Sequence, residues 1–336
     1  MAYYLGVDHQ GAGTVDLRSH YLGLELANPF VPSSTPLSKN LDSARQLEDA
    51  GAGALIMHSL FQEEIEANRG ADLGNTAGGD LLGSVHNLGI REEYLLHFRR
   101  LHAAMAIPVI PSLNGSSPGN WVDFAAELEA AGAPALELNV YYVAADISES
   151  ANAVEQRIID IFRAVKDRVS VPVGIKLSPY FSSPGKLVTA LEAEGAAGVA
   201  LFNRFYQPNI DLDTLSISDS LELSTSGDSL LAMRWIAILH GRVKLSLAAT
   251  GGIHFAEDAI KMLLCGADVT YLGSTLLANG PKQLTRIHDN TIKWLEKRGF
   301  ESLSQMRGSL SQINCDDPSA FARGHYIKML SEYKLR

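Results

Sequence analysis

The sequence has few cysteines and no long apolar run, and each lack excludes a class of protein. Among its 336 residues are only two cysteines, Cys265 and Cys315, too few for a disulfide framework, a four-cysteine zinc site or an internal iron–sulfur cluster. The first ten residues lack the basic start and apolar stretch of a secretory signal, and no segment approaches the roughly 20 apolar residues of a membrane-spanning helix. We therefore expect a cytoplasmic protein without a membrane partner.

Positive charge is also scarce. The chain has 28 Lys and Arg against 38 Asp and Glu, and this net charge of −10 argues against nucleic acid as a partner. Its ten histidines form no metal-ligand pattern with Cys, Asp or Glu, so we expect no metal site. Hydrophobic residues at 46% and charged residues at 20% are typical of a globular protein, which leaves small molecules as the expected ligands.

A short pattern recurs where the predicted helices end. An amphipathic helix stops at a glycine suited to the left-handed conformation, an alanine follows, and an apolar strand begins within a few residues. The copies lie at 50–57, 131–139, 194–203 and 265–273. Apolar strands that alternate with helices in this way predict parallel strand pairing.

Eight strands are predicted, which indicates an α/β fold of the (β/α)8 TIM-barrel type. The predicted strands are about 30–34, 54–59, 108–113, 135–140, 171–177, 197–203, 244–249 and 268–272. An open doubly wound sheet is the alternative, although it would more naturally carry a GxGxxG fingerprint, which the sequence lacks.

We interpret 1–336 as one domain, with an N-terminal extension at 1–25 that covers the barrel floor and a C-terminal helical tail at 300–336. Two connections, 60–90 after the second strand and 204–227 after the sixth, are longer than plain loops. We expect them to form substrate lids or subunit contacts, with surface decoration as the alternative.

Polar residues lie in and after the predicted strands, at the end of a barrel where active sites form. Asn139 and Lys176 are embedded in apolar strands, where an unpaired amide or ammonium is costly, so both are expected to face a ligand. Lys176 favours a flavin, because a reduced flavin carries negative charge that a cation stabilises. A Schiff-base lysine and an ion pair with Glu137 are the alternatives.

Glycines follow the last two predicted strands, at Gly251, Gly252 and Gly273. Backbone amides at such positions, next to a helix start, predict a phosphate site of the kind found in many barrels. The alternative is that Gly251 and Gly252 only form a tight turn.

In order and spacing, several segments resemble the FMN-dependent dihydroorotate dehydrogenases, most like the soluble class 1 enzymes. They are YLGLELANPF at 21–30, GIKLSPYF at 174–181, TGGI at 250–253, LLCGA at 263–267 and YLGSTLL at 271–277. The resemblance implies a single FMN-binding barrel, a homodimer, and an electron acceptor that is either a small molecule or a separate protein. The flavin contacts that it implies are Ser33, Ser34, Thr35, Ser59, Asn139, Lys176, Phe202, Gly227, Gly251, Gly252, Gly273 and Ser274.

The residues expected to contact the substrate depart from the family pattern. The family motif Asn-x-Ser-Cys-Pro-Asn reads Asn139-Val140-Tyr141-Tyr142-Val143-Ala144 here, which puts Tyr142 at the position of the base. His58 replaces a lysine, and the motif Asn-x-Met-Gly-x-x-Asn is replaced over residues 86–92. The resemblance implies catalytic roles for Tyr142, Lys176 and His58, and substrate contacts from His58, His86, Asn87, Leu88, Gly89, Asn114 and Asn203.

Tyr142 changes the expected chemistry. A phenol has an ordinary pKa of about 10, so it is a poor base at neutral pH, but it can donate a proton while a flavin delivers hydride to a C=C bond. We therefore expect an FMN oxidoreductase that favours C=C reduction or uses a substrate other than dihydroorotate, with dihydroorotate oxidation by a rebuilt pocket as an alternative. Tyr142 as a mere aromatic lid, and His58 as a histidine satisfied in a polar pocket, are also alternatives.

Two other functions stay open at this point. One is a flavin-binding subunit that relays electrons without catalysis of its own, and the other is a non-redox lyase or isomerase that acts on a sugar phosphate. Bound flavin separates the second from the rest, and reduction of that flavin by a substrate separates an enzyme from a relay.

Overall fold

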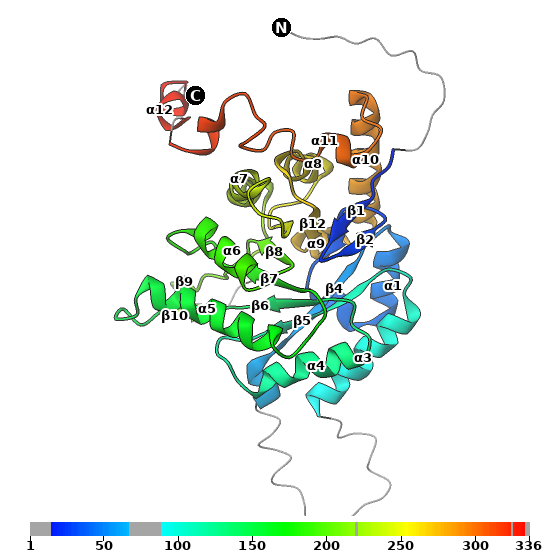
Figure 1. The fold of residues 1–336 in the computed structure, drawn as a ribbon, viewed down its shortest axis with the longest axis vertical. Coiled ribbons are helices and arrows are strands. Elements are labelled where there is room, and N and C mark those ends of the chain that lie inside the picture. The colour runs from blue at the N-terminus through cyan, green and yellow to red at the C-terminus, as the bar shows by residue number, and fades with distance from the viewer. Residues whose placement is uncertain (1–14, 67–88, 219–220, 324, 333–336) are drawn as a thin grey trace, which may run out of the picture.

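Eight parallel strands form a nearly closed barrel in the computed structural model, which describes residues 15–66, 89–218, 221–323 and 325–332 (Figure 1). The strands are β3 (Phe30–Pro32), β4 (Leu55–Phe61), β5 (Val109–Asn114), β6 (Leu136–Asn139), β7 (Val173–Leu177), β8 (Gly198–Leu201), β11 (Ser246–Thr250) and β12 (Val269–Leu272). They pair in the order β3-β12-β11-β8-β7-β6-β5-β4, and the two end strands contact each other. The predicted α/β barrel is confirmed, and the open doubly wound sheet is wrong.

Helices surround the barrel and bury their apolar faces against it (Figure 1). Local capping helps to fix where they begin: the Asn40 side chain accepts hydrogen bonds from the first turn of α1, and Ser150 caps α5. A left-handed glycine, Gly266, ends α8, as the recurring sequence pattern predicts. The helices are α1 (Leu41–Asp49), α3 (Ile90–Ala104), α4 (Asp123–Ala130), α5 (Ala151–Lys166), α6 (Pro184–Ala193), α7 (Ser229–Leu239), α8 (Ala256–Cys265), α9 (Ser274–Asn279) and α10 (Lys282–Arg298).

The N-terminal end of the barrel is closed by an antiparallel pair, β1 (Ser19–Tyr21) and β2 (Leu24–Leu26). Leu22, in the turn between them, is fully buried beneath two strand glycines. A Cβ atom on Gly174 or Gly198 would lie 2.9 or 2.7 Å from a methyl carbon of Leu22. Those glycines therefore leave the space that Leu22 fills inside this end of the barrel.

Further segments lie outside the strand and helix repeat. After β8, the short strands β9 (Asn209–Asp211) and β10 (Ser216–Ser218) form an antiparallel pair. The C-terminal segment contains α11 (Leu303–Met306), η4 (Pro318–Phe321) and α12 (His325–Glu332). Its backbone donates hydrogen bonds from Gly308 and Leu310 to α8 and from Gln312 to α7. In the described part of the chain no helix combines the length and the apolar character that crossing a membrane requires.

The fit between Leu22 and Gly174 is testable by a double-mutant cycle. Leu22→Ala is expected to lower the free energy of unfolding by about 2–5 kcal/mol because it leaves a cavity. Gly174→Ala is expected to cost about 1–3 kcal/mol through overpacking. In the double variant the added methyl meets space instead of Leu22, so urea denaturation should give less than the sum of the two losses. Strict additivity would show that the two residues do not share this space.

Candidate active site

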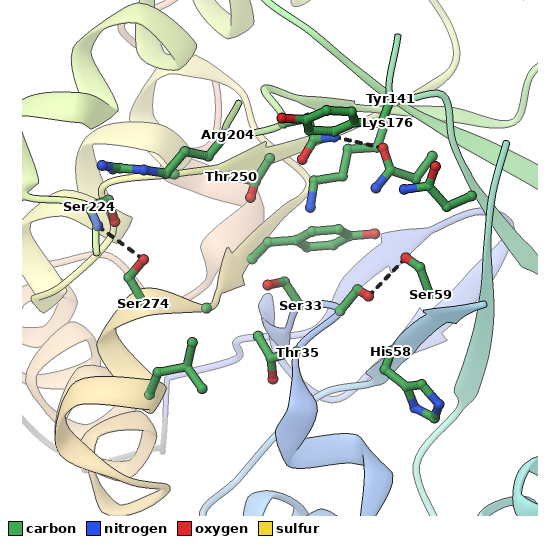
Figure 2. Close-up of a pocket in the computed structure, with 18 of the residues that line it drawn as sticks. Ser33, Thr35, His58, Ser59, Tyr141, Lys176, Arg204, Ser224, Thr250 and Ser274 are labelled. Atoms are coloured by element: carbon green, nitrogen blue, oxygen red, sulfur yellow. Dashed lines mark hydrogen bonds between the residues drawn. The ribbon is translucent and has the colours of Figure 1, made fainter. Parts of the chain in front are cut away.

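A cavity of about 470 Å³ opens at the C-terminal ends of the barrel strands (Figure 2). Its volume falls within the roughly 300–1,000 Å³ of small-molecule sites. Most residues predicted from the sequence to bind cofactor or substrate line it. They are Ser33, Ser34, Thr35, His58, Ser59, Asn114, Asn139, Lys176, Phe202, Asn203, Gly251, Gly252, Gly273 and Ser274.

Lys176 lies in β7 and points into the cavity (Figure 2). The residue is only 8% exposed, and within the described residues its ammonium has no hydrogen-bond or ion-pair partner. A buried cation without a partner is costly, so this position is suited to a negatively charged ligand. The alternative of an ion pair with Glu137 is not seen, because no oxygen of Glu137 lies within 4.0 Å of the ammonium.

Glu137 lies deeper in the barrel than the cavity and is fully buried. Burial raises the pKa of its carboxyl group, and the charge of Lys176 acts in the opposite direction. The hydroxyl of Ser112 donates a hydrogen bond of 3.3 Å to the carboxyl group. Glu137 is thus held by the barrel interior, and it leaves the ammonium of Lys176 available to a ligand.

Amides and hydroxyls line the wall beside Lys176. The Asn203 amide donates to the side-chain oxygen of Asn139 at 2.7 Å. Ser34 and Ser59 are hydrogen-bonded at 3.1 Å, which joins the end of β3 to that of β4 (Figure 2). Such a wall offers both donors and acceptors, as the polar edge of a heterocyclic ring requires.

The opposite end of the cavity is formed by the loops that follow β11 and β12. Gly251 and Gly252 both have positive φ, and a Cβ atom on Gly252 would lie 2.3 Å from the Ser229 amide nitrogen, so only glycine fits there. The Gly252 amide donates to the Ser224 hydroxyl at 3.3 Å, and the Ser224 amide donates to the Ser274 hydroxyl at 3.2 Å. Two serine hydroxyls and the backbone of the glycine loops therefore lie close together at this end of the cavity.

Arg204 adds a cation at this end of the cavity. Its side chain extends toward the Ser224–Ser274 hydrogen bond (Figure 2), and its Nη1 lies 3.4 Å from a carboxylate oxygen of Asp228. A guanidinium beside hydroxyls and glycine backbone is suited to a phosphate group. Gly227, predicted as a phosphate-side residue, lies in the turn η3 (Ser226–Asp228) and does not line the cavity.

The two adjacent tyrosines after β6 point in different directions. Asn139 and Tyr141 both line the cavity, whereas Val140 is buried in the core between barrel and helices. Tyr142 does not line the cavity; its hydroxyl donates to Glu149 at 2.5 Å, a bond that raises the pKa of the phenol. Tyr141, and not Tyr142, is therefore the tyrosine of this segment that lines the cavity, and the catalytic role of Tyr142 stays a prediction.

Strand geometry explains this outcome. Side chains two residues apart in an extended segment share a face, so Tyr141 follows Asn139 into the cavity while Tyr142 takes the opposite face. The family motif places the base by its position along the chain, which does not reveal the face of the strand on which a side chain lies. The alternation of side chains along a strand, counted from Asn139, predicts that Tyr141 faces the cavity.

His58 lies at the edge of the cavity, with its ring directed away from Lys176 (Figure 2). The ring packs edge-on against Tyr94, with centroids 5.0 Å apart, and its Nδ1 lies 3.4 Å from the Ser38 hydroxyl. Burial lowers the pKa of His58 to about 4, and the nearby charges of Lys39 and His97 act in the same direction. His58 is therefore neutral at pH 7, and its role toward a substrate stays a prediction.

The remaining predicted substrate residues belong to the segment after β4. His86, Asn87 and Leu88 lie outside the described residues. Gly89 directly precedes α3 and is not part of the cavity wall. In the ranges that the structure describes, no three His, Cys, Asp or Glu side chains gather as a metal ion would require. The cavity is also lined by residues that were not predicted as site residues: Pro36, Lys39, Phe61, Glu64, Tyr141, Arg204, Tyr206, Ser224, Thr250, Ile253, Tyr271 and Leu277.

Comparison with known proteins agrees with the barrel and the cavity. The family model described as dihydroorotate dehydrogenase matches residues 16–295, and the chain therefore belongs to the dihydroorotate dehydrogenase family. That match spans every strand of the barrel and every described residue of the cavity.

Individual relatives are distant but similar over nearly their whole length. Dihydroorotate dehydrogenase A (fumarate) of Lactobacillus delbrueckii subsp. bulgaricus is 26% identical over 86% of this chain and 96% of its own. The catalytic subunit of dihydroorotate dehydrogenase B (NAD(+)) is 25% identical in Endomicrobium trichonymphae, over 89% of this chain and 98% of its own. The corresponding subunit of Methanothermobacter thermautotrophicus is 24% identical, over 87% and 97%.

The depressed pKa of His58 predicts a pH dependence of stability. Between pH 6.5 and about 4 the unfolded chain binds a proton at this residue that the folded chain does not, so stability is lost as the pH falls through this window. His58→Asn keeps a polar partner for Ser38 and is expected to reduce this loss, as measured by urea denaturation at both ends of the window. Lys39→Met should reduce it in part, and identical pH profiles for the wild type and His58→Asn would refute the assignment.

Proposed function

We propose that the protein is an FMN-dependent oxidoreductase that acts on a CH–CH or C=C bond of a small molecule. The observation that carries this proposal is Lys176, a buried residue whose ammonium has no partner among the described side chains and is directed into the cavity. Membership of the dihydroorotate dehydrogenase family supports it. When bound, FMN would supply hydride transfer.

The residues of the cavity fit the two ends of FMN. A phosphate group matches Arg204, the hydroxyls of Ser224 and Ser274, and the glycine loops after β11 and β12. At the other end, Lys176 supplies the positive charge that stabilises a reduced isoalloxazine, and Asn139 supplies hydrogen-bonding groups. Because both ends of the cavity match, we assign all of these residues to the cofactor.

The substrate side supports a reaction unlike simple proton abstraction by a thiolate. Tyr141 takes the place next to Asn139 on the cavity face, and burial raises the pKa of its phenol, more than a backbone hydrogen bond from Tyr206 lowers it. A protonated phenol donates a proton or a hydrogen bond and does not act as a base at neutral pH. We therefore propose that the enzyme reduces a C=C bond, or oxidises a substrate other than dihydroorotate.

The names of two relatives support a proposal for the protein that accepts electrons from this chain. Two of those compared above are catalytic subunits, which supports a separate protein as the electron acceptor of this chain. The family resemblance also supports a homodimer. Size measurement of the purified protein, alone and with its co-purifying proteins, tests both assignments.

The phosphate assignment of Arg204 is tested by the ratio of two affinities. Arg204→Met removes the guanidinium and is expected to weaken FMN by about 10- to 100-fold, since hydrogen bonds to charged groups contribute about 1.5–3 kcal/mol. Riboflavin lacks the phosphate and should bind the variant and the wild type alike. Titration of flavin-free protein, followed by flavin fluorescence, measures both. Arg91→Met, which removes an arginine paired with Glu127 outside the cavity, is the matched control.

Two outcomes would overturn parts of this assignment. An equal loss for FMN and riboflavin would place Arg204 away from the phosphate. The wild type could instead bind neither flavin and bind a sugar phosphate tightly. That result would support a lyase or isomerase in which Lys176 forms a Schiff base. With FMN bound, an anaerobic screen of unsaturated acids and amides, with dihydroorotate included, identifies the substrate by the change in flavin absorption.

A further inference from the structure

The segment between β6 and α5 is fixed at two neighbouring residues by contacts on opposite sides. On the cavity side, the Tyr141 ring stacks on Phe205, with centroids 4.0 Å apart and planes inclined by 22°. Phe205 in turn packs edge-on against Tyr180 at 5.5 Å. These rings join the segments that follow β6, β7 and β8, so Tyr141 lies in a wall built from three strand ends.

On the other side, Tyr142 belongs to a cluster with Glu149 and Arg157. Glu149 accepts the Tyr142 hydroxyl on one carboxylate oxygen and Arg157 at 2.7 Å on the other. The Arg157 guanidinium also lies over the Tyr142 ring, 4.4 Å from its centre. The Glu149 side chain is 11% exposed and that of Arg157 is 34% exposed, so the cluster is partly shielded from solvent.

The cluster links the segment to a rigid element. Arg157 lies in α5, and Glu149 stands just before the residue that caps this helix. The arginine hydrogen bond to Glu149 lowers the pKa of the carboxyl group, with the Tyr142 hydrogen bond as a second cause, so the carboxylate is charged at neutral pH. Tyr142 is therefore tied to the start of α5 by a charged, mutually supporting set of contacts.

We propose that Tyr141 is the residue of this segment that faces the flavin and the substrate bound against it, and that Tyr142, Glu149 and Arg157 form a positioning cluster that holds it there. The first half of this proposal rests on the proposed function, whereas the second concerns the protein alone. Because one face of the Tyr141 ring is covered by Phe205, its place in the cavity is set by packing and not by the ligand. Tyr141 and Tyr206 line the same cavity, and this aromatic wall with a protonated phenol suits a planar, conjugated substrate that carries a hydrogen-bond acceptor.

Flavin fluorescence distinguishes the two tyrosines. A tyrosine in contact with an isoalloxazine quenches its fluorescence by electron donation, and phenylalanine does not. In FMN-loaded protein, Tyr141→Phe is expected to raise the fluorescence yield and lengthen its lifetime, while the neighbouring Tyr142→Phe leaves the main lifetime in place. A rise for Tyr142→Phe alone, or for neither variant, would overturn the assignment of Tyr141.

The positioning cluster is tested by variants of Glu149, with Tyr141 unchanged and its contact with the flavin followed by fluorescence. Glu149→Ala removes both of its bonds, and it is expected to split the flavin lifetime into several components as Tyr141 loses its fixed place. Glu149→Gln keeps an acceptor for Tyr142 and should restore part of the single lifetime. A lifetime unchanged in Glu149→Ala would show that the cluster does not position Tyr141.

A measurement on flavin-free protein tests the positioning cluster independently of the proposed function. A double-mutant cycle of Tyr142→Phe and Glu149→Ala, each of which removes the hydrogen bond between the two side chains, should show by urea denaturation that the two losses are not additive. This coupling is expected whether or not the protein binds FMN. If the protein binds no flavin, the proposed function and the role of Tyr141 fail together, and additivity in the cycle would by itself overturn the cluster.

Discussion

The charge of Lys176 is the constraint on which the rest of the site depends. An ammonium in the middle of a barrel strand is tolerated only when something compensates it, and in the described residues neither a carboxylate nor a carbonyl oxygen does so. Glu137 is the nearest candidate by sequence, but its own burial favours the neutral form and it lies beyond ion-pair distance. The barrel thus holds a positive charge at its mouth, in a protein whose net charge is −10.

The remainder of the barrel directs ligands to this charge. Leu22 fills the N-terminal end of the barrel, with room left by Gly174 and Gly198, whereas the cavity with Lys176 opens at the C-terminal end. There the cavity has a polar wall around Asn139 at one end and the guanidinium of Arg204 beside the glycine loops at the other. These two unlike ends suit a ligand with two chemically different parts, which is the character of the FMN proposed above.

Much of the fold was predictable because its signals are local. Apolar strands between capped amphipathic helices identify each repeat, and all eight predicted strands overlap the strands of the structure. Lys176 and Asn139 were also predictable, because a polar residue within an apolar strand stands out in one dimension. The insertion after β4 could not be checked for His86, Asn87 and Leu88, which lie outside the described residues.

The sequence was less informative where the placement of a side chain depended on its orientation. Tyr141 and Tyr142 are chemically identical, and motif position alone favoured the wrong neighbour for the cavity, whereas strand alternation separates them. Arg204 follows its strand like other polar residues at strand ends, and the part of the cavity that it shares with Ser224 and Ser274 brings together segments far apart in sequence. His58 was selected by position too, but its ring is held by Ser38 and Tyr94, which no sequence pattern connects to it.

An anaerobic redox titration of the FMN-loaded protein tests the central claim most directly. If Lys176 stabilises the charge of the reduced flavin, Lys176→Met should lower the two-electron midpoint potential by about 30 mV or more, which corresponds to about 1.4 kcal/mol. Lys176→Arg, which keeps the charge, should retain most of the wild-type potential. Equal midpoint potentials for the wild type and Lys176→Met would contradict the account, because the ammonium would then not face the flavin.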